Sequence, residues 1–282
     1  MPASRFKGGM LVMMLLMVSI GLRAEQPRIA LVIDDMGFQQ HRDQAIMALD
    51  SRVVVAIIPD APMASHLARQ ARVQGREALV HLPLSGLGPD NCEPELTCMG
   101  SDWAVKRMAA YLSEAFETVE GAVGFNNHQG SRFTGDRHAV ARLVAGVSQL
   151  EYRLGRPLLV LDSRTSPTTV LEQEARNVGL VSARRHVFLD HSDRVEDIEQ
   201  AWDALIAMAH ERGQAIAIGH PRPNTLKVLE RRLPELEPDG VELVTLTELV
   251  CPSTGAELVS RASGCRQDVR GIPSGAYEGL PP

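Results

Sequence analysis

The sequence is poor in aromatic residues and has no excess of positive charge. Phe, Trp and Tyr make up 4% of the 282 residues, and 29 lysines and arginines are outnumbered by 35 aspartates and glutamates. The net charge of −6 and the lack of a basic patch argue against nucleic acid as a partner. The shortage of aromatic side chains also argues weakly against a deep cleft lined by stacking rings.

Several catalytic fingerprints are missing as well. The chain has no G-x-x-x-x-G-K-[ST] loop and no G-x-G-x-x-G turn, so the common phosphate-binding motifs are absent. It also lacks G-x-S-x-G, and the serines in GSRF and DSRT do not follow a strand and precede a helix as a nucleophilic serine does. Nucleotide chemistry and serine nucleophiles are therefore not expected.

Cysteine is scarce, with only four in the chain. Cys92 and Cys98 lie in NCEPELTC, whereas Cys251 and Cys265 flank a polar C-terminal stretch. Of the three possible connectivities, the two local pairings are the simplest, and a zinc knuckle is the alternative. Neither pair has C-x-x-C spacing. Disulfides persist in oxidising compartments, so this pattern fits an exported protein with structural rather than nucleophilic cysteines.

The first residues have the pattern of a secretory signal peptide. A basic start is followed by an apolar stretch over residues 10–22, too short for a comfortable membrane span, and then by the small Ala24. We expect residues 1–24 to be removed, leaving a periplasmic or otherwise exported protein without a stable membrane span. An uncleaved N-terminal anchor is the alternative, because the large Leu22 precedes the cleavage point.

Apolar segments typical of strands alternate with helical patterns over residues 27–250. The expected strands are 29–33, 53–59, 77–84, 122–127, 157–162, 186–190, 215–220 and 241–246, and the clearest helices are 63–75, 102–119 and 197–213. This alternation predicts a single α/β domain with a parallel sheet, closed or nearly closed into a barrel. A doubly wound open sheet is the alternative. Residues 251–282 are polar and rich in Gly, Ser and Pro, and are expected to form a loosely ordered tail.

Polar residues follow the apolar runs at the ends of several expected strands. They are Asp34, Asp35, His81, Asn126, Asn127, His128, Asp162 and His220. The carboxyl ends of parallel strands converge on the active site in such folds. One aspartate and two histidines suit a divalent transition metal, a second carboxylate can accept a proton from water, and a further histidine can donate one. The adjacent aspartates reach one site only if the strand ends there, which Gly37 permits.

The motifs VIDDMG, ALVHLPL, GFNNHQGSRFT, LDSRTSP and IGHPRPNT occur in this order. With them the sequence resembles the divergent polysaccharide deacetylases, a branch of the metal-dependent carbohydrate deacetylases. The resemblance covers about residues 27–250. It implies an irregular (β/α)7-type barrel with mostly parallel strands, which agrees with the alternation.

The resemblance also implies a metal centre. Asp34 matches the catalytic base of the family and Asp35 its metal ligand, while His81 matches the first histidine of a His-x-x-x-His motif. The second position of that motif is Ser85, a poor zinc ligand, so His128 is the candidate for the third ligand. The expected cofactor is a divalent transition metal, with zinc the first candidate. Asp34 as a helix cap, and His81 or His128 as buried structural histidines, are the alternatives.

Further residues are assigned by the same resemblance. His220 resembles the general acid of the family, and Asp162 the carboxylate that supports the charged network. Arg132, Arg164 and Asn127 are candidates for binding substrate. A capping role for Asp162, a loop-closing role for His220 and backbone hydrogen bonding by Asn127 are the alternatives.

Together these observations predict an exported metal-dependent hydrolase that removes acyl groups, acetyl above all, from an N-acylated carbohydrate of the cell envelope. The rival prediction is a catalytically silent barrel that binds a glycan or an envelope protein. Ser85, at the second position of the ligand motif, favours the rival.

Overall fold

The computed structural model describes residues 26–88 and 92–251. The strands are β1 (Arg28–Met36), β2 (Val54–Ile57), β3 (Ala78–Leu84), β4 (Gly124–Gln129), β5 (Leu159–Asp162), β6 (Val181–Arg184), β7 (Val187–Phe188), β8 (Gln214–Gly219) and β9 (Glu242–Leu243). The helices are α1 (Gln40–Met47), α2 (Ala64–Val73), α3 (Val105–Thr118), α4 (Arg137–Leu154), α5 (Leu171–Asn177), α6 (Val195–Arg212), α7 (Pro223–Arg232) and α8 (Leu246–Val250), with a 3-10 turn at Leu233–Glu235.

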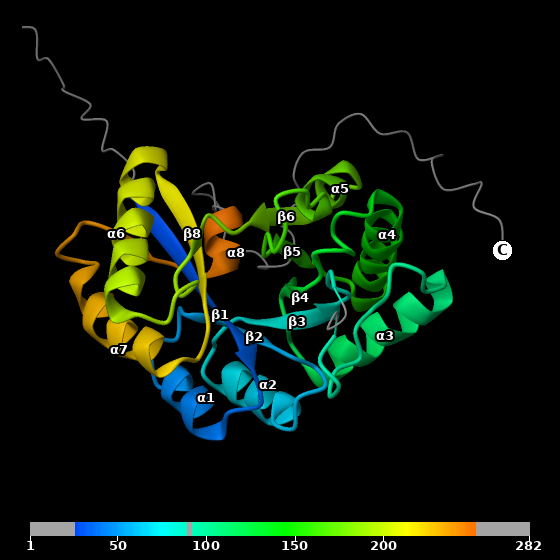
Figure 1. The fold of residues 1–282 in the computed structure, drawn as a ribbon, viewed down its shortest axis with the longest axis horizontal. Helices are drawn as coiled ribbons and strands as arrows, with labels where there is room; N and C mark the ends of the chain where they lie inside the picture. The colour runs from blue at the N-terminus through cyan, green and yellow to red at the C-terminus, as the bar shows by residue number, and fades with distance from the viewer. Residues whose placement is uncertain (1–25, 89–91, 252–282) are drawn as a thin grey trace, which may run out of the picture.

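The strands form one curved parallel sheet in the order β6-β5-β4-β3-β2-β1-β8-β7, and β9 pairs with β1. From β1 to β6 this order follows the chain without reversal, whereas a doubly wound sheet reverses at a switch point. Figure 1 shows the helices around the outside of the sheet and α8 within its curve. The predicted α/β fold of the (β/α)7-barrel type is confirmed.

The two ends of the sheet are joined by the chain itself. Strands β6 and β7 lie at opposite ends of the strand order but are separated by only Arg185 and His186. The backbone N–H of Arg185 donates to Asp162 in β5, and that of His186 donates to Ile216 in β8. This short segment therefore links the two edges of the curved sheet, and β6 is a strand that the sequence patterns did not predict.

Alternation along the strands divides the core into two layers. Ile29, Leu31 and Ile33 of β1 belong to the outer cluster, which packs under the helices. Ala30 and Val32 belong to the inner cluster, together with residues of α8. Because neighbouring strand residues face opposite layers, every second residue at a carboxyl end points into the barrel.

Local signals explain the ends of the helices. Helix α6 has Glu196 and Asp197 in its first turn, near the positive end of the helix dipole, and Gly213 in a left-handed conformation at its C-terminus. In α4, the carboxylate of Asp136 accepts hydrogen bonds from two N–H groups of the first turn. These interactions define where α4 begins and where α6 begins and ends.

The predicted Cys92–Cys98 disulfide is confirmed. The expected signal peptide, the C-terminal tail from residue 252 and Cys265 of the second predicted pair lie outside the described residues. Within residues 26–88 and 92–251, no helix is long and apolar enough to cross a membrane.

Candidate metal centre

Strands β1, β3 and β4 bring three potential metal ligands together: Asp35 and His128 lie one residue before the ends of β1 and β4, and His81 lies in the middle of β3. Oδ1 of Asp35 lies 3.1 Å from Nε2 of His81 and 2.9 Å from Nδ1 of His128. The two imidazole nitrogens lie 3.1 Å apart. Among the described residues, only these three form a group of His, Cys, Asp and Glu side chains compact enough to hold a metal ion.

The end of β1 turns both neighbouring aspartates toward this point. Alternation places Asp34 on the inner face and would place Asp35 on the outer face. Asp35 instead has a left-handed backbone with φ of 56°, at a register shift in the pairing of β1 with β2, and this irregularity redirects its side chain. Gly37 follows with φ of 124°, and a Cβ there would lie 2.5 Å from Cβ of Ala61. The turn therefore requires glycine.

Hydrogen bonds orient the His81 ring. The amide of Asn126 donates to Oδ1 of Asp34 at 2.8 Å and to Oγ of Ser163 at 3.1 Å, so its oxygen faces the other way. That oxygen accepts from Nδ1 of His81 at 2.8 Å. Nδ1 of His81 therefore carries a proton, and Nε2 is the ring nitrogen that faces Asp35 and His128.

In His128 the two ring nitrogens have the reverse roles of those in His81. Its Nε2 donates to Oε2 of Glu93 at 2.9 Å, which leaves Nδ1 facing Asp35. Burial alone lowers the pKa of His128, but the hydrogen bonds and negative charges of Asp35 and Glu93 outweigh burial and raise it. Each histidine thus presents one nitrogen to the centre while a polar neighbour holds the other.

The two aspartates differ in ionisation. Burial raises the pKa of Asp34, which is 3% exposed, although His81, His220 and the hydrogen bond from Asn126 oppose this rise. Burial also acts on Asp35, but the hydrogen bonds and charges of His128 and His81 prevail and hold its pKa far below the usual range. The surroundings of Asp35 thus favour its anionic form, whereas burial favours the protonated form of Asp34.

His220 lies opposite these residues at the end of β8. Its Nε2 is 3.7 Å from Oδ2 of Asp35, and its Nδ1 donates to Oδ1 of the fully buried Asp190 at 2.8 Å. The other oxygen of Asp190 accepts from the backbone N–H of His220 and the hydroxyl of Thr225. Asp190 was not among the predicted site residues, although it follows an apolar run as the predicted ones do.

Asp162, expected to support the charged network, lies on the outer face of β5. Its Oδ1 accepts from the backbone N–H of Arg164, and its Oδ2 accepts from the Thr169 hydroxyl and the Glu172 N–H. Strand alternation is the reason, because the preceding leucine, in the inner cluster, faces the barrel. Asp162 orders its loop and the start of α5, and the carboxylate that holds His220 is Asp190.

The residues expected to bind substrate follow β4 and β5. Arg132 and Arg164 are exposed, and Arg164 has a left-handed φ of 51°. Asn127 is buried, and its amide donates to the carbonyl of Gln129 and the hydroxyl of Thr165. Both N–H donors of Asn127 are therefore engaged between loops, and substrate binding by the two exposed arginines stays a prediction.

Ser85 lies outside the group of ligands. Its hydroxyl is buried and has no hydrogen-bond partner among the described residues. Its backbone N–H donates to Met99, and its carbonyl accepts from Phe133. The third ligand atom of the group comes from His128 in β4, and position 85 supplies none.

Residues 31–250 match the family of divergent polysaccharide deacetylases. The matched span includes every strand-end residue described above. The chain belongs to this family. The resemblance inferred from the sequence motifs is therefore confirmed.

Relatives of this family member occur in bacteria. An uncharacterized protein of Haemophilus influenzae is 36% identical over 224 residues, which cover 79% of this chain and 77% of the relative. The uncharacterized protein YibQ of Escherichia coli is 32% identical over 223 residues, covering 79% of this chain and 67% of YibQ. The crystal structure of the uncharacterized protein ATU2773 from Agrobacterium tumefaciens has a TM-score of 0.73 at 22% identity, covering 80% of this chain and 90% of that chain. This last likeness concerns the fold alone.

The donor set of this deacetylase-family chain fits a divalent transition metal. Two imidazole nitrogens and one carboxylate oxygen form a triangle with sides of 2.9, 3.1 and 3.1 Å. Ligand atoms bound to one tetrahedral zinc at about 2.0–2.2 Å lie roughly 3.3 Å apart, which is close to these separations. Three protein ligands also leave a position open, as catalytic zinc sites do.

Proposed function

We propose that this protein is an exported metal-dependent hydrolase that removes acyl groups, acetyl above all, from an N-acylated carbohydrate of the cell envelope. The observation that carries the proposal is the convergence of Asp35, His81 and His128 on one point, with Asp34 and His220 beside it. Membership of the deacetylase family supports a carbohydrate substrate.

In this proposal, Asp35, His81 and His128 hold a divalent transition metal, with zinc the first candidate. When bound, such an ion supplies Lewis-acid chemistry to an acyl carbonyl and lowers the pKa of water. Asn126 and Glu93 keep the ligating nitrogens of the two histidines directed at the site.

The proton transfers fall to two further side chains. Asp34 accepts the proton of the attacking water, for which its raised pKa is suited. His220 donates a proton to the departing amine nitrogen, and Asp190 keeps the His220 ring oriented by accepting from its Nδ1. The C–N bond of the amide breaks, and the products are a carboxylate and a free amine.

The proposed substrate class rests on two exposed arginines, on the N-terminal sequence and on the disulfide. Arg132 and Arg164, exposed residues in the segments that follow β4 and β5, are proposed to bind or orient the sugar. The signal-peptide pattern of residues 1–24 and the Cys92–Cys98 disulfide support an exported protein, and hence a carbohydrate of the envelope.

A catalytically silent barrel that binds a glycan or an envelope protein is the second candidate. It is favoured by Ser85 at the second position of the ligand motif, whose buried hydroxyl has no hydrogen-bond partner among the described residues. The Ser85→His variant separates the two. A large gain in zinc affinity would indicate a degraded natural site, and an unchanged affinity would agree with His128 as the third ligand.

The first experiment is elemental analysis of protein purified without chelators or a histidine tag, followed by an assay of acetate release from N-acetylated glycan fragments. Near-stoichiometric transition metal and acetate release, both lost in His81→Ala and His128→Ala, are the expected results. A protein that stays metal-free in excess zinc and releases no acetate would overturn the proposal in favour of the silent barrel.

A further inference from the structure

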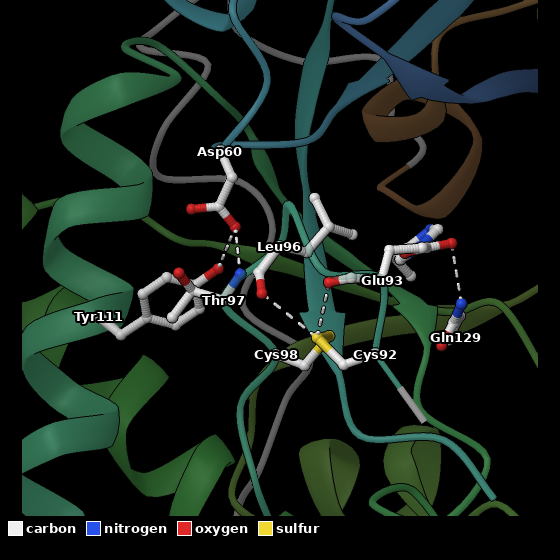
Figure 2. Close-up of a disulfide and its surroundings, with 9 residues drawn as sticks. Asp60, Cys92, Glu93, Leu96, Thr97, Cys98, Tyr111 and Gln129 are labelled. Atoms are coloured by element: carbon white, nitrogen blue, oxygen red, sulfur yellow. Dashed lines mark hydrogen bonds and ion pairs between the residues drawn. A yellow bond between two sulfur atoms is a disulfide. The ribbon is translucent and has the colours of Figure 1, made fainter. Parts of the chain in front are cut away.

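The loop between β3 and α3 places one carboxylate against His128, at the ring nitrogen that does not face Asp35. Oε2 of Glu93 accepts from Nε2 of His128 at 2.9 Å, and its Oε1 accepts from the side-chain amide of Gln129 at 3.0 Å. Figure 2 shows Glu93 reaching from the loop to Gln129. Because each oxygen has its own partner on β4, the carboxylate is held in one orientation.

A disulfide closes the loop that carries Glu93. Cys92, the neighbour of Glu93 in the chain, is bonded to Cys98, six positions on. Within the closed segment the N–H of Leu96 donates to the carbonyl of Glu93, forming a turn. Short cross-linked loops have few conformations, so the backbone of Glu93 is restrained close to where the folded protein needs it.

The C-terminal part of this loop is hydrogen-bonded to the barrel. The N–H of Thr97 donates to Asp60 at 2.9 Å, and the hydroxyl of Tyr111 donates to the same carboxylate oxygen, as Figure 2 shows. Met99, just after the disulfide, is fully buried and exchanges backbone hydrogen bonds with the end of β3. The disulfide thus ties Glu93 to a segment that is itself fixed.

We propose that Glu93 is a positioning residue for His128, and that the Cys92–Cys98 disulfide holds it in that position. The inference rests on the proposed metal site. Glu93 is 46% exposed, so its ion pair with His128 adds little to the stability of the fold. Its effect lies in the ring orientation and tautomer of His128, because a ligating histidine needs its other nitrogen held by a partner.

Zinc titration of the full-length metal-free protein, with a competing chelating dye, tests the proposal. Glu93→Ala is expected to weaken zinc binding by about 10- to 100-fold, as loss of such an outer partner does. Glu93→Gln keeps an oxygen that can accept from Nε2 of His128, and should lose less. Glu95→Ala, an exposed carboxylate in the same closed loop, is the matched control and should bind zinc as the wild type does.

The role of the disulfide is tested by a double-variant comparison. The Cys92→Ser, Cys98→Ser protein should lose zinc affinity, and adding Glu93→Ala to it should cost less than Glu93→Ala costs in the wild type. Full additivity would overturn the proposed link between the disulfide and Glu93.

A second readout needs no metal at all. Nitrogen and proton NMR of the His128 ring in the metal-free protein should show a hydrogen-bonded Nε2–H in the wild type and in Glu95→Ala, and the loss of this hydrogen bond in Glu93→Ala. Unchanged zinc affinity and an unchanged Nε2–H signal of His128 in Glu93→Ala would overturn the inference while leaving the proposed function intact. Zinc binding that depends on Glu93 without any acetate release would instead overturn the proposed function alone.

Discussion

At the scale of single residues, the most informative pair is Asp34 and Asp35, adjacent in the chain but different in environment. Asp34 is almost fully buried and has a raised pKa, whereas the side chain of Asp35 is 37% exposed and has a strongly lowered one. Asp34 accepts from a neutral amide, and Asp35 lies between two imidazoles. These environments support the proposed roles of Asp34 as proton acceptor and Asp35 as metal ligand.

Replacing Asp34 by Asn should therefore separate metal binding from turnover. Asp34→Asn is expected to keep near-stoichiometric zinc and to lose about 10²- to 10⁴-fold in acetate release, the usual contribution of a general base. Asp35→Asn should lose the metal as well. The measurements are metal content and rate on the same preparations, and an Asp34→Asn protein with full turnover would rule out Asp34 as the base.

Replacing Asp190 should also separate turnover from metal binding, through its contact with His220. One oxygen of Asp190 accepts from Nδ1 of His220, and the other accepts from the His220 N–H and the Thr225 hydroxyl. An asparagine cannot make all three bonds, because its side-chain nitrogen is a donor. Asp190→Asn should lower kcat by about 10²-fold or more, with zinc affinity kept within about 2-fold. The exposed Asp193→Asn is the control. A parallel loss of zinc would mean that Asp190 supports the fold rather than His220.

At the scale of elements, the turn from β1 into α1 sets the direction of Asp35. Oδ2 of Asp43, in α1, accepts from the backbone N–H groups of Gly37 and Gln39, both at 3.1 Å. Its Oδ1 is buried and without a hydrogen-bond partner among the described residues. Burial raises the pKa of Asp43 above its usual 3.8, although the two backbone bonds and the nearby Arg42 oppose the rise.

A pH-dependent stability difference follows from the raised pKa of Asp43. Because the pKa of Asp43 is higher in the folded protein, the group contributes its full stabilisation when the pH is below 3.8, the unfolded pKa. This stabilisation is lost as the pH rises through the folded-state pKa. Asn at position 43 keeps the acceptor oxygen and does not titrate. The Tm of Asp43→Asn minus that of the wild type should thus become more positive between pH 4 and pH 8. A difference that stays flat over this range would show that Asp43 is ionised throughout.

The strand ends were the part of this site that the sequence could predict. Apolar runs followed by Asp or His led to Asp35 and His128, which lie one residue before the ends of β1 and β4, and parallel pairing brings such ends to one edge. His81 belongs to the same group although it lies in the middle of β3, with three strand residues after it. The face of each residue was harder to predict. Asp162 points outward because β5 continues its alternation through that position, whereas Asp35 points inward because its left-handed backbone breaks the alternation.

Other contacts had no signal in the sequence. Glu93 meets His128 across 35 positions of the chain, and only the folded loop shows which carboxylate of NCEPELTC turns inward. Strand β6 has only four residues, too few for a clear period, and was not predicted. Strand β7 lies within the expected strand 186–190, and Asp190 at the end of that segment could have been included by the rule that selected the other site residues.

At the scale of the whole molecule, the candidate ligands join separate parts of the chain. Asp35, His81 and His128 belong to β1, β3 and β4, so one ion would cross-link strands that are joined otherwise by backbone pairing and by the inner and outer clusters. An ion that binds only the folded state raises its stability through mass action. The unfolded chain scatters the three ligands and competes weakly.

Zinc should accordingly raise the melting temperature, and a chelator should reverse the effect. At free zinc of about 100 times Kd the gain is about 2.7 kcal/mol, which corresponds to roughly 5–10 °C for a domain of this size. His81→Ala should abolish the shift, whereas the exposed His41→Ala on α1 should retain it. Differential scanning calorimetry across a zinc series measures both. An equal rise in His81→Ala would place the stabilising zinc elsewhere on the molecule, because no cross-link through β3 could then account for it.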